Sequence, residues 1–274
     1  MPSDQPGGMP PSSGWSHPRP AGGTDLAGRV ALVTGGTRGI GRAIAIRMRD
    51  AGARVLVCGR SEPQTLPDGI EFAAADVRDP DEARAVVDEV VRRLGRLDLA
   101  VNNAGGSPSV PAASVSPRLV TAVVQLNLLA PFFVAQAANA VMQDQPEGGL
   151  ILNIGSVSAT RPAPGTAAYA AAKAGLVTLT QALAIEWAPA VRVNCVTAGL
   201  VRTQDTAAHY GDEAALAAVA ATVPLGRMAS PDDIADACLL LASPLASYVS
   251  GANLVVDGGG QRPTFLDAAR PVQQ

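Results

Sequence analysis

The amino-acid sequence predicts an α/β protein built around a doubly wound parallel sheet of about seven strands, with helices on both faces. Short apolar, β-branched segments alternate along the chain with longer segments of helical periodicity, as in parallel strands joined by crossover helices. The strand segments are apolar without alternation, which is typical of strands covered on both faces. No linker interrupts the chain after Leu26, so one domain is expected.

The expected elements follow in the order that this alternation requires. In the first half they are a strand over 29–34, a helix over 39–53, strands over 54–58 and 70–76, a helix over 80–94 and a strand over 97–103. In the second half they are a helix over about 117–142, a strand over 150–156, a helix around Tyr169, a strand over 191–197, helices near Asp212 and Pro231, and a strand over 253–257. The ligand site of such a sheet lies beyond the carboxyl ends of its strands.

Both ends of the chain lie outside the domain expected over 26–262. Residues 1–25 are rich in Pro, Gly and Ser and almost lack aliphatic side chains, so they are expected to form a disordered tail. Residues 263–274 are expected to form a C-terminal tail. The N-terminal segment lacks a basic region followed by an apolar one, and no run of eighteen apolar residues occurs, which predicts a cytoplasmic protein that does not enter a membrane.

Composition also narrows the class of ligand. The net charge is −3 and no basic cluster occurs, which argues against a nucleic-acid partner. Three cysteines, Cys58, Cys195 and Cys238, are odd in number and lie in apolar segments, as reduced core thiols do. With His17 and His209 as the only histidines, we expect no metal site.

A glycine-rich loop follows the first expected strand and opens the first helix. Gly35, Gly39 and Gly41 would let backbone N–H groups and the helix N-terminus approach a pyrophosphate. Glycines also mark plain turns, but the strand–loop–helix context favours a dinucleotide site. The other loop residues assigned to the cofactor are Thr37, Arg38 and Ile40.

The end of the second strand bears on which dinucleotide is bound. An acidic residue there would bind the ribose 2′-hydroxyl and repel a 2′-phosphate, but the sequence reads Cys58-Gly-Arg-Ser61. Arg60, Ser61 and Arg38 could instead bind the 2′-phosphate, which favours NADP. The alternatives are that both arginines are ordinary solvated side chains, or that NAD is also used.

Tyr169 and Lys173 lie four residues apart on an expected helix, so they share one face. A nearby cation favours the phenolate and brings the pKa of a tyrosine toward neutrality. An Ala-rich surface helix would also carry such a pair by chance. The position of the pair after the glycine loop, and after a strand that ends in Ser156, favours catalysis.

Together these motifs resemble the short-chain dehydrogenase/reductase family over roughly residues 26–260. The resemblance rests on TGGTRGIG (34–41), NNAG (102–105), Asn127, Ser156, the Tyr169/Lys173 pair and VDGG (256–259). It is closest to the branch of 3-oxoacyl-carrier-protein reductases and hydroxysteroid dehydrogenases. It implies a single Rossmann-type domain that transfers a hydride between NADP(H), with NAD possible, and a ketone or secondary alcohol, in a homo-oligomer, either tetramer or dimer.

The resemblance also implies a role for each catalytic residue. Tyr169 would exchange a proton with the substrate oxygen, and Ser156 would hold that oxygen. Lys173 would bind the nicotinamide ribose and lower the pKa of Tyr169. Asn127 would anchor a water that connects Lys173 to solvent.

Further cofactor contacts follow from the resemblance alone. Asp76 and Val77 would contact adenine, Asn103, Ala104 and Gly105 would line the cleft, and Val201 and Thr203 would meet the nicotinamide carboxamide. The alternative for the segment 103–105 is an ordinary strand terminus, and for Asp76 a helix-capping acid ahead of Pro80.

The sequence departs from the family pattern in two places that bear on the site. Ala198-Gly199 replaces the usual Pro-Gly after the sixth strand, which gives the loop more backbone freedom. The segment Ser61 to Gly69 is short and holds two prolines, so the helix usual there is expected to be missing or reduced to a turn.

Substrate preference is expected to lie in two segments, 106–117 and 204–224. Both are rich in small residues, with His209 and Tyr210 the only large polar rings in the second. Abundant Ala and Val favour a hydrophobic substrate, such as a 3-oxoacyl or steroid-like ketone. The alternative function is an NADP-binding sensor without turnover; a methyltransferase and an enoyl reductase, whose Tyr-to-Lys spacing is wider, are disfavoured.

Overall fold

The computed structural model describes residues 23–204, 206 and 210–261. Seven parallel strands form one sheet in the order β3-β2-β1-β4-β5-β6-β7. The strands are β1 (Val30–Thr34), β2 (Arg54–Gly59), β3 (Ile70–Ala74), β4 (Leu99–Asn102), β5 (Gly149–Ser156), β6 (Val191–Ala198) and β7 (Asn253–Val256). The predicted doubly wound parallel sheet of seven strands is confirmed.

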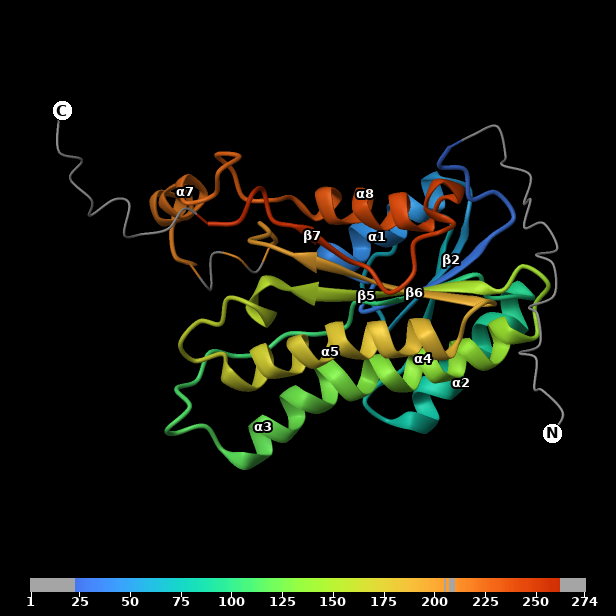
Figure 1. Ribbon diagram of the computed structural model, residues 1–274, viewed down its shortest axis with the longest axis horizontal. Helices are drawn as coiled ribbons and strands as arrows, with labels where there is room; N and C mark the ends of the chain where they lie inside the picture. Colours follow the sequence, from blue (N-terminus) through green and yellow to red (C-terminus); the bar gives the residue numbers. More distant parts are fainter. Residues whose placement is uncertain (1–22, 205, 207–209, 262–274) are drawn as a thin grey trace, which may run out of the picture.

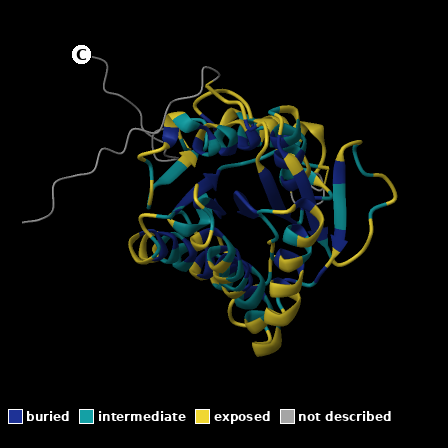
Figure 2. Cartoon of the chain, turned by 90° about the vertical axis from the view of Figure 1, so that its right-hand side faces the viewer, coloured by how far each residue is buried: buried dark blue, intermediate teal, exposed yellow. Residues whose placement is uncertain are grey.

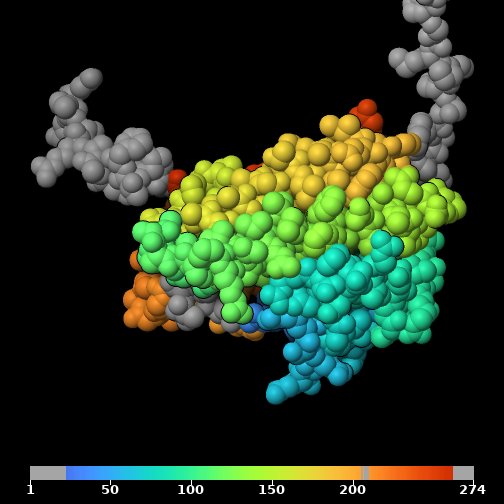
Figure 3. All heavy atoms as spheres, turned by 90° about the horizontal axis from the view of Figure 1, so that it is seen from below, coloured from blue at the N-terminus to red at the C-terminus, as the bar shows by residue number. Residues whose placement is uncertain are grey.

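Helices cover the sheet on both faces. The described helices are α1 (Gly39–Asp50), α2 (Pro80–Leu94), α3 (Pro117–Val124), α4 (Ala130–Gln143), α5 (Ala167–Glu186), α7 (Glu213–Ala221) and α8 (Pro231–Ala242). In Figure 1, α1 and α8 lie on one side of the sheet and α2, α4 and α5 on the other. Figure 2 shows the buried strands between the two layers, and Figure 3 views the molecule from the side of α2, α4 and α5.

Two apolar cores, one on each face, hold these layers to the sheet. Ile44, Met48 and Ile234 on α1 and α8 pack against one face, and Val87 and Met142 on α2 and α4 against the other. Each helix buries its apolar stripe in this way, and burial of a large aliphatic side chain contributes about 1.5–3 kcal/mol.

The strand order reverses direction between β1 and β4, which places the ends of these strands beside an open crevice. In the register of the sheet, Thr34 pairs with Cys58 and Ser156 pairs with Ala198. The residues that follow β1, β2, β4, β5 and β6 therefore meet at one edge of the sheet, where the site was expected.

Two expectations about helices have clear outcomes. No helix lies between β2 and β3 in the described chain, so the reduced connection over 61–69 is confirmed. The helix expected over 117–142 is not a continuous α-helix, because a π-helical turn (η1, Gln125–Leu129) separates α3 from α4. Such turns often occur at functional sites, and Asn127 lies at the centre of this one.

The expectation that every strand is covered on both faces is wrong for the edge strand β7. Leu254 and Val256 pack on the core beneath α8, whereas the Val255 side chain on the opposite face is 50% exposed. An edge strand lacks a neighbour on one side, so the helix layer does not extend over it.

The three cysteines are free thiols in the core, as expected. Two helical segments, Pro117–Gln143 and Ala167–Glu186, are long and apolar enough to cross a membrane by length and composition alone. Core helices of water-soluble proteins share that property, and both segments here pack on one face of the sheet.

Candidate active site

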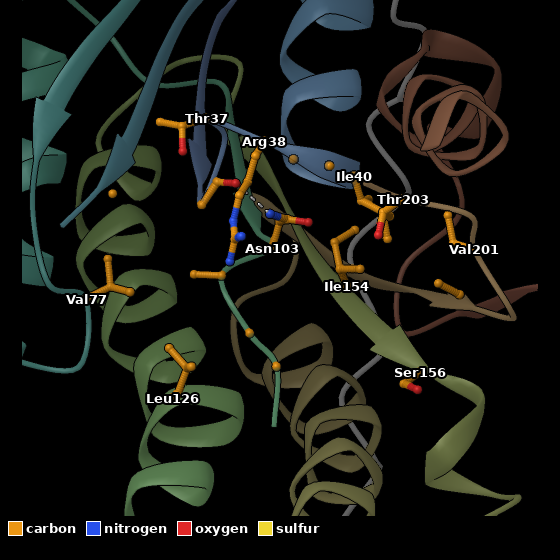
Figure 4. Close-up of a pocket in the computed structure, with 18 of the residues that line it drawn as sticks. Thr37, Arg38, Ile40, Val77, Asn103, Leu126, Ile154, Ser156, Val201 and Thr203 are labelled. Atoms are coloured by element: carbon orange, nitrogen blue, oxygen red, sulfur yellow. Dashed lines mark hydrogen bonds between the residues drawn. The ribbon is translucent and has the colours of Figure 1, made fainter. Parts of the chain in front are cut away.

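A cavity of about 720 Å³ opens at the carboxyl ends of the strands. Its size is typical of small-molecule and cofactor sites. In Figure 4, Val77 and Leu126 lie toward one end, and Ser156 and Val201 toward the other. Every residue assigned to the cofactor from the sequence lines this cavity, namely Gly35, Thr37, Arg38, Gly39, Ile40, Gly41, Arg60, Ser61, Asp76, Val77, Asn103, Ala104, Gly105, Tyr169, Lys173, Val201 and Thr203.

The loop between β1 and α1 requires glycine for steric reasons. Gly35 and Gly39 have φ values of +62° and +53°, a region that other residues rarely adopt. A side chain on Gly41 would place its Cβ 2.3 Å from Asn103 Nδ2 and 2.4 Å from the Gly35 carbonyl oxygen. Only a bare backbone fits here.

The first turn of α1 is open to an anion. The N-cap residue Arg38 makes no side-chain cap hydrogen bond, and the first turn contains no acidic residue. Backbone N–H groups and the helix dipole therefore point at the cavity without a competing carboxylate. These features fit a dinucleotide pyrophosphate.

Asn103 ties the glycine loop to the end of β4. Its Nδ2 donates to the carbonyl oxygens of Thr34 and Gly35 at 2.9 and 3.1 Å. The hydrogen bond to Gly35 is the dashed line near Asn103 in Figure 4. Thr34 Oγ1 in turn accepts the backbone N–H groups of Asn103 and Ala104, both at 3.0 Å. The segment 103–105 is thus both a strand terminus and a wall of the cavity.

The end of the cavity near β2 is rich in charge. Arg60 and Ser61 follow β2, and Arg38 of the glycine loop lines the same cavity. Asp76 does not cap α2, because Asp79 is the N-cap and accepts the N–H groups of Asp81 and Glu82. The capping alternative for Asp76 is therefore wrong.

At the other end, Ser156, Tyr169 and Lys173 come together as the motif predicts. Ser156 is the last residue of β5, and the other two lie on α5. Lys173 Nζ lies 5.8 Å from the centre of the Tyr169 ring and donates to the Ile154 carbonyl oxygen at 2.7 Å. The Lys173 side chain is buried, and burial lowers its pKa to about 8.

The pKa of Tyr169 departs from the sequence-based expectation. It is raised, chiefly because burial disfavours the phenolate, and a hydrogen bond with the Ser156 side chain acts in the opposite direction. Lys173 does not lower it here, because its ammonium group bonds to Ile154 and lies against the face of the ring. Tyr169 and Lys173 thus share one face of α5, but the Lys173 ammonium group bonds to Ile154 rather than to the Tyr169 hydroxyl.

Asn127 is fully buried and lies behind the wall of the cavity rather than on it. Its Nδ2 donates to the carbonyl oxygens of Gly106 and Val123, each at 2.9 Å, and its Oδ1 accepts from Gly106 N at 3.0 Å. The bond to Val123, four residues back, occupies a carbonyl that a regular α-helix would use, in keeping with the π-helical turn.

Gly105 lies close to both Asn127 and Lys173. A Cβ at Gly105 would lie 2.8 Å from Asn127 Oδ1 and 3.4 Å from Lys173 Nζ. Both side chains thus lie close to the position of such a Cβ, and a larger residue at Gly105 would collide with Asn127 Oδ1.

Described residues that follow β6 also line this end of the cavity, among them Val201, Thr203, Thr206 and Tyr210. Thr206 Oγ1 accepts the Thr203 N–H at 2.6 Å, and the Thr206 carbonyl accepts the Tyr210 N–H at 3.0 Å. At the Ala198-Gly199 departure, a Cβ on Gly199 would lie 2.7 Å from Asp257 Cα. Glycine is thus required at position 199 even without the usual proline before it. His209 lies outside the described residues.

Several lining residues escaped the sequence analysis. They are chiefly Arg78, Leu126 and Ile154, whereas Thr206 and Tyr210, which also line the cavity, belong to the segment 204–224 expected to bear on substrate preference. Arg78 lies two residues after Asp76, just beyond the end of β3, and this position could have indicated from the sequence that Arg78 lines the cavity. Within the described residues, no group of three His, Cys, Asp or Glu side chains could hold a metal ion.

Comparisons with known proteins agree with this geometry. A family model described as enoyl-(acyl carrier protein) reductase matches residues 35–261. A 3α-hydroxysteroid dehydrogenase from Mediterraneibacter gnavus is 38% identical over 86% of this chain and 98% of its own length. A 3-oxoacyl-(acyl-carrier-protein) reductase from Vibrio cholerae is 37% identical, with the same shares covered. The structure of an aldohexose dehydrogenase from Thermoplasma acidophilum superimposes with a TM-score of 0.82 at 29% identity, over 92% of this chain and 99% of that one.

Proposed function

This chain belongs to the short-chain dehydrogenase/reductase family of oxidoreductases, and we propose that it transfers a hydride between NADP(H) and a ketone or secondary alcohol. One observation carries the proposal: Ser156, Tyr169 and the buried Lys173 line the same cavity as an anion-binding glycine loop. Hydride transfer needs a held dinucleotide, an oriented carbonyl and one proton donor.

Each catalytic side chain has one task in this proposal. Bound nicotinamide supplies or accepts the hydride. Ser156 holds the substrate oxygen by a hydrogen bond, and Tyr169 gives its phenolic proton to that oxygen, or takes it back in the oxidative direction. The raised pKa of Tyr169 keeps this proton in place until the substrate oxygen becomes negative.

Lys173 and Asn127 support the proton donor. Lys173 holds the nicotinamide ribose hydroxyls, and with a pKa near 8 its ammonium is ready to exchange protons close to neutral pH. Asn127 fixes the Gly105–Gly106 backbone beside Lys173 through its bonds to Gly106. A water held there would complete a proton path to solvent.

The preference for NADP over NAD is supported by charge at the end of β2. Arg60 and Arg38 line the cavity, Ser61 adds a hydroxyl, and the strand end Cys58 to Ser61 contains no acidic residue. A guanidinium fork matches a phosphate in geometry and charge.

A hydrophobic substrate is supported by the walls near Tyr169. Ala198, Gly199 and Val201 line the main cavity there. A second, much smaller hollow adjoins the other side of Tyr169 and is lined mainly by apolar side chains, among them Pro108, Val110, Leu119 and Val120. No charged side chain lines the second hollow, and the charged residues of the main cavity are Arg38, Arg60, Asp76, Arg78 and Lys173. A 3-oxoacyl or steroid-like ketone fits these walls better than a charged one.

Turnover is tested by fluorescence titration with NADPH and NADH, followed by assays on a panel of hydrophobic ketones and 3-oxoacyl thioesters. We expect NADPH to bind more tightly and at least one ketone to be reduced. Binding of a cofactor without turnover of any ketone in the panel would favour the alternative of an NADP-binding sensor. The site gives that alternative no support, because Ser156, Tyr169 and Lys173 line the cavity together. Absence of binding by either cofactor would overturn the proposal.

The remaining expectations concern the setting of the enzyme. We place its domain at 26–262, in the cytoplasm, where the reduced core thiols would persist. A homo-oligomer is supported by large apolar side chains at the surface, such as Ile185 at 81% and Leu129 at 41% exposure on the α4 and α5 layer. Light scattering after size exclusion would test for a dimer or tetramer.

A further inference from the structure

Arg78 is a cavity-lining side chain that holds the carboxylate of Asp76. Its Nε donates to Asp76 Oδ1 at 2.8 Å and to Oδ2 at 3.1 Å, and its Nη2 donates to Oδ2. The backbone N–H of Arg78 adds a bond to Oδ1 at 3.2 Å. Both oxygens of the carboxylate are therefore occupied by one guanidinium group.

The turn that carries this pair does not depend on the Arg78 side chain. Asp79 N donates to the Asp76 carbonyl at 2.9 Å, and Asp76 N donates to Glu82 Oε2 at 2.7 Å. Asp79 then caps α2 through its own side chain. Because backbone and capping bonds already fix the turn, shape alone does not explain the arginine.

The pair stands among the charges that would receive a 2′-phosphate. The pKa of Asp76 is lowered, first by the hydrogen bond from Arg78 and to a smaller degree by the positive charge of Arg60. The geometry agrees, because Ala75 N donates to the Gly59 carbonyl at 2.9 Å, so Arg60 and Asp76 follow paired strand ends and line the same cavity. Without Arg78, an unpaired carboxylate would stand beside the arginine that is proposed to hold the phosphate.

We propose that Arg78 is a specificity-determining residue that favours NADP(H) by neutralising Asp76 at the adenosine end of the cavity. The proposal rests on the function proposed above. Asp76 can then serve the adenine ring without repelling a 2′-phosphate, whose charge NAD lacks. Arg78 thus acts with Arg38 and Arg60, but through the carboxylate rather than through the phosphate.

The test is a charge cycle on the two residues, with dissociation constants for NADPH and NADH as the readout. The variants are Arg78→Gln, Arg78→Lys, Asp76→Asn and the double variant Asp76→Asn/Arg78→Gln. Arg84→Gln on the exposed side of α2 removes one arginine outside the cavity and is the matched control. Adenosine 2′,5′-bisphosphate and AMP, titrated in the same way, separate the adenosine end from the nicotinamide end.

The expected result is a change in preference rather than in overall binding. Because the pair is partly exposed, with side chains 33% and 27% accessible, screening limits the effect, and we expect Arg78→Gln to lower the preference for NADPH about fivefold to tenfold. Arg78→Lys should keep most of the preference, and Asp76→Asn should raise it. The double variant should return close to the original preference, and high salt should shrink every difference.

Two outcomes would overturn the inference. One is equal weakening of NADPH and NADH by Arg78→Gln, which is what a purely structural arginine would give. The other is a double variant that keeps the low preference of Arg78→Gln. Failure of the unaltered protein to bind either dinucleotide would instead refute the proposed function, so the two failures can be told apart.

Discussion

The two ends of the cavity differ in how far their charged groups are exposed and in whether these groups are paired. At the adenosine end, charges are partly exposed and paired, as in the Asp76–Arg78 ion pair. At the other end, the ammonium group of Lys173 is buried near the Tyr169 ring in the cavity that Ser156 also lines, and burial shifts the pKa values of Lys173 and Tyr169. Paired charges in water discriminate between ligands at small cost, whereas proton transfer needs groups whose pKa values burial has moved.

The largest expected effect is at the proton donor. Tyr169→Phe removes the phenolic proton but keeps the ring, so kcat should fall about 10³-fold or more while the NADPH dissociation constant stays nearly unchanged. Steady-state kinetics and fluorescence titration would measure the two quantities. Unchanged turnover would show that the catalytic end has been assigned to the wrong residue.

Lys173→Met should separate activity from stability. Loss of the ammonium should lower kcat about 100-fold. The lysine pKa falls from its usual 10.5 to about 8 on burial, a cost of roughly 3 kcal/mol. After allowance of about 1 kcal/mol for the lost bond to Ile154, the variant should gain about 2 kcal/mol in free energy of unfolding at pH 7, measured with urea.

The pH dependence of that gain has a definite sign. Between about pH 8 and 10.5 the unfolded chain holds the Lys173 proton more tightly than the folded chain, so the stability of the unaltered protein rises with pH relative to the variant. The advantage of Lys173→Met should therefore be full below pH 8 and shrink toward pH 10.5. A variant that is less stable at neutral pH would mean that the buried ammonium is compensated by groups other than Ile154.

At the charged end, Arg60→Asp should reverse the preference for the dinucleotide. Replacement of a guanidinium by a carboxylate removes a charge-assisted bond and adds repulsion, so the NADPH dissociation constant should rise about 10- to 100-fold. NADH binding should change little or improve. If the NADPH constant does not move, the 2′-phosphate does not lie at Arg60.

The smallest effect is expected in the loop that joins the catalytic end to the substrate segment. Thr206→Val keeps the shape of the side chain but removes the oxygen that accepts the Thr203 N–H. Loss of one such bond is worth about 1 kcal/mol, so KM for the cofactor should rise about fivefold with kcat largely preserved. Thr222→Val at the C-terminal cap of α7, outside the cavity lining, provides the control.

Much of the site could be predicted from the sequence because its signals are local. The glycine loop, Ser156 at a strand end and the Tyr169/Lys173 spacing are patterns within single elements or across one junction. Parallel strands bring their carboxyl ends to one edge, so correct element boundaries alone placed these groups together. The same local signals predicted the missing helix between β2 and β3.

Other features depended on distances that no local pattern encodes. Asn127 was predicted to anchor a water from within a continuous helix, but it lies in a π-helical turn and its side chain bonds to the Gly106 backbone. The prediction that β7 is covered on both faces was wrong, because the position of a strand at the edge depends on the order of strands in the whole sheet. Arg78 and Thr206 line the cavity because of how the loops after β3 and β6 fold, and this folding depends on contacts between segments far apart in the sequence.

The sequence by itself determined the doubly wound sheet and the meeting of the glycine loop, Ser156, Tyr169 and Lys173 at one edge of it, because periodicity and short spacings specify secondary structure and its junctions. Only the tertiary structure decided how these groups are tuned. It buried Lys173 and raised the pKa of Tyr169, and it paired Asp76 with Arg78. Desolvation and ion pairing depend on every neighbour in space, and those neighbours are assembled from segments that lie far apart along the chain.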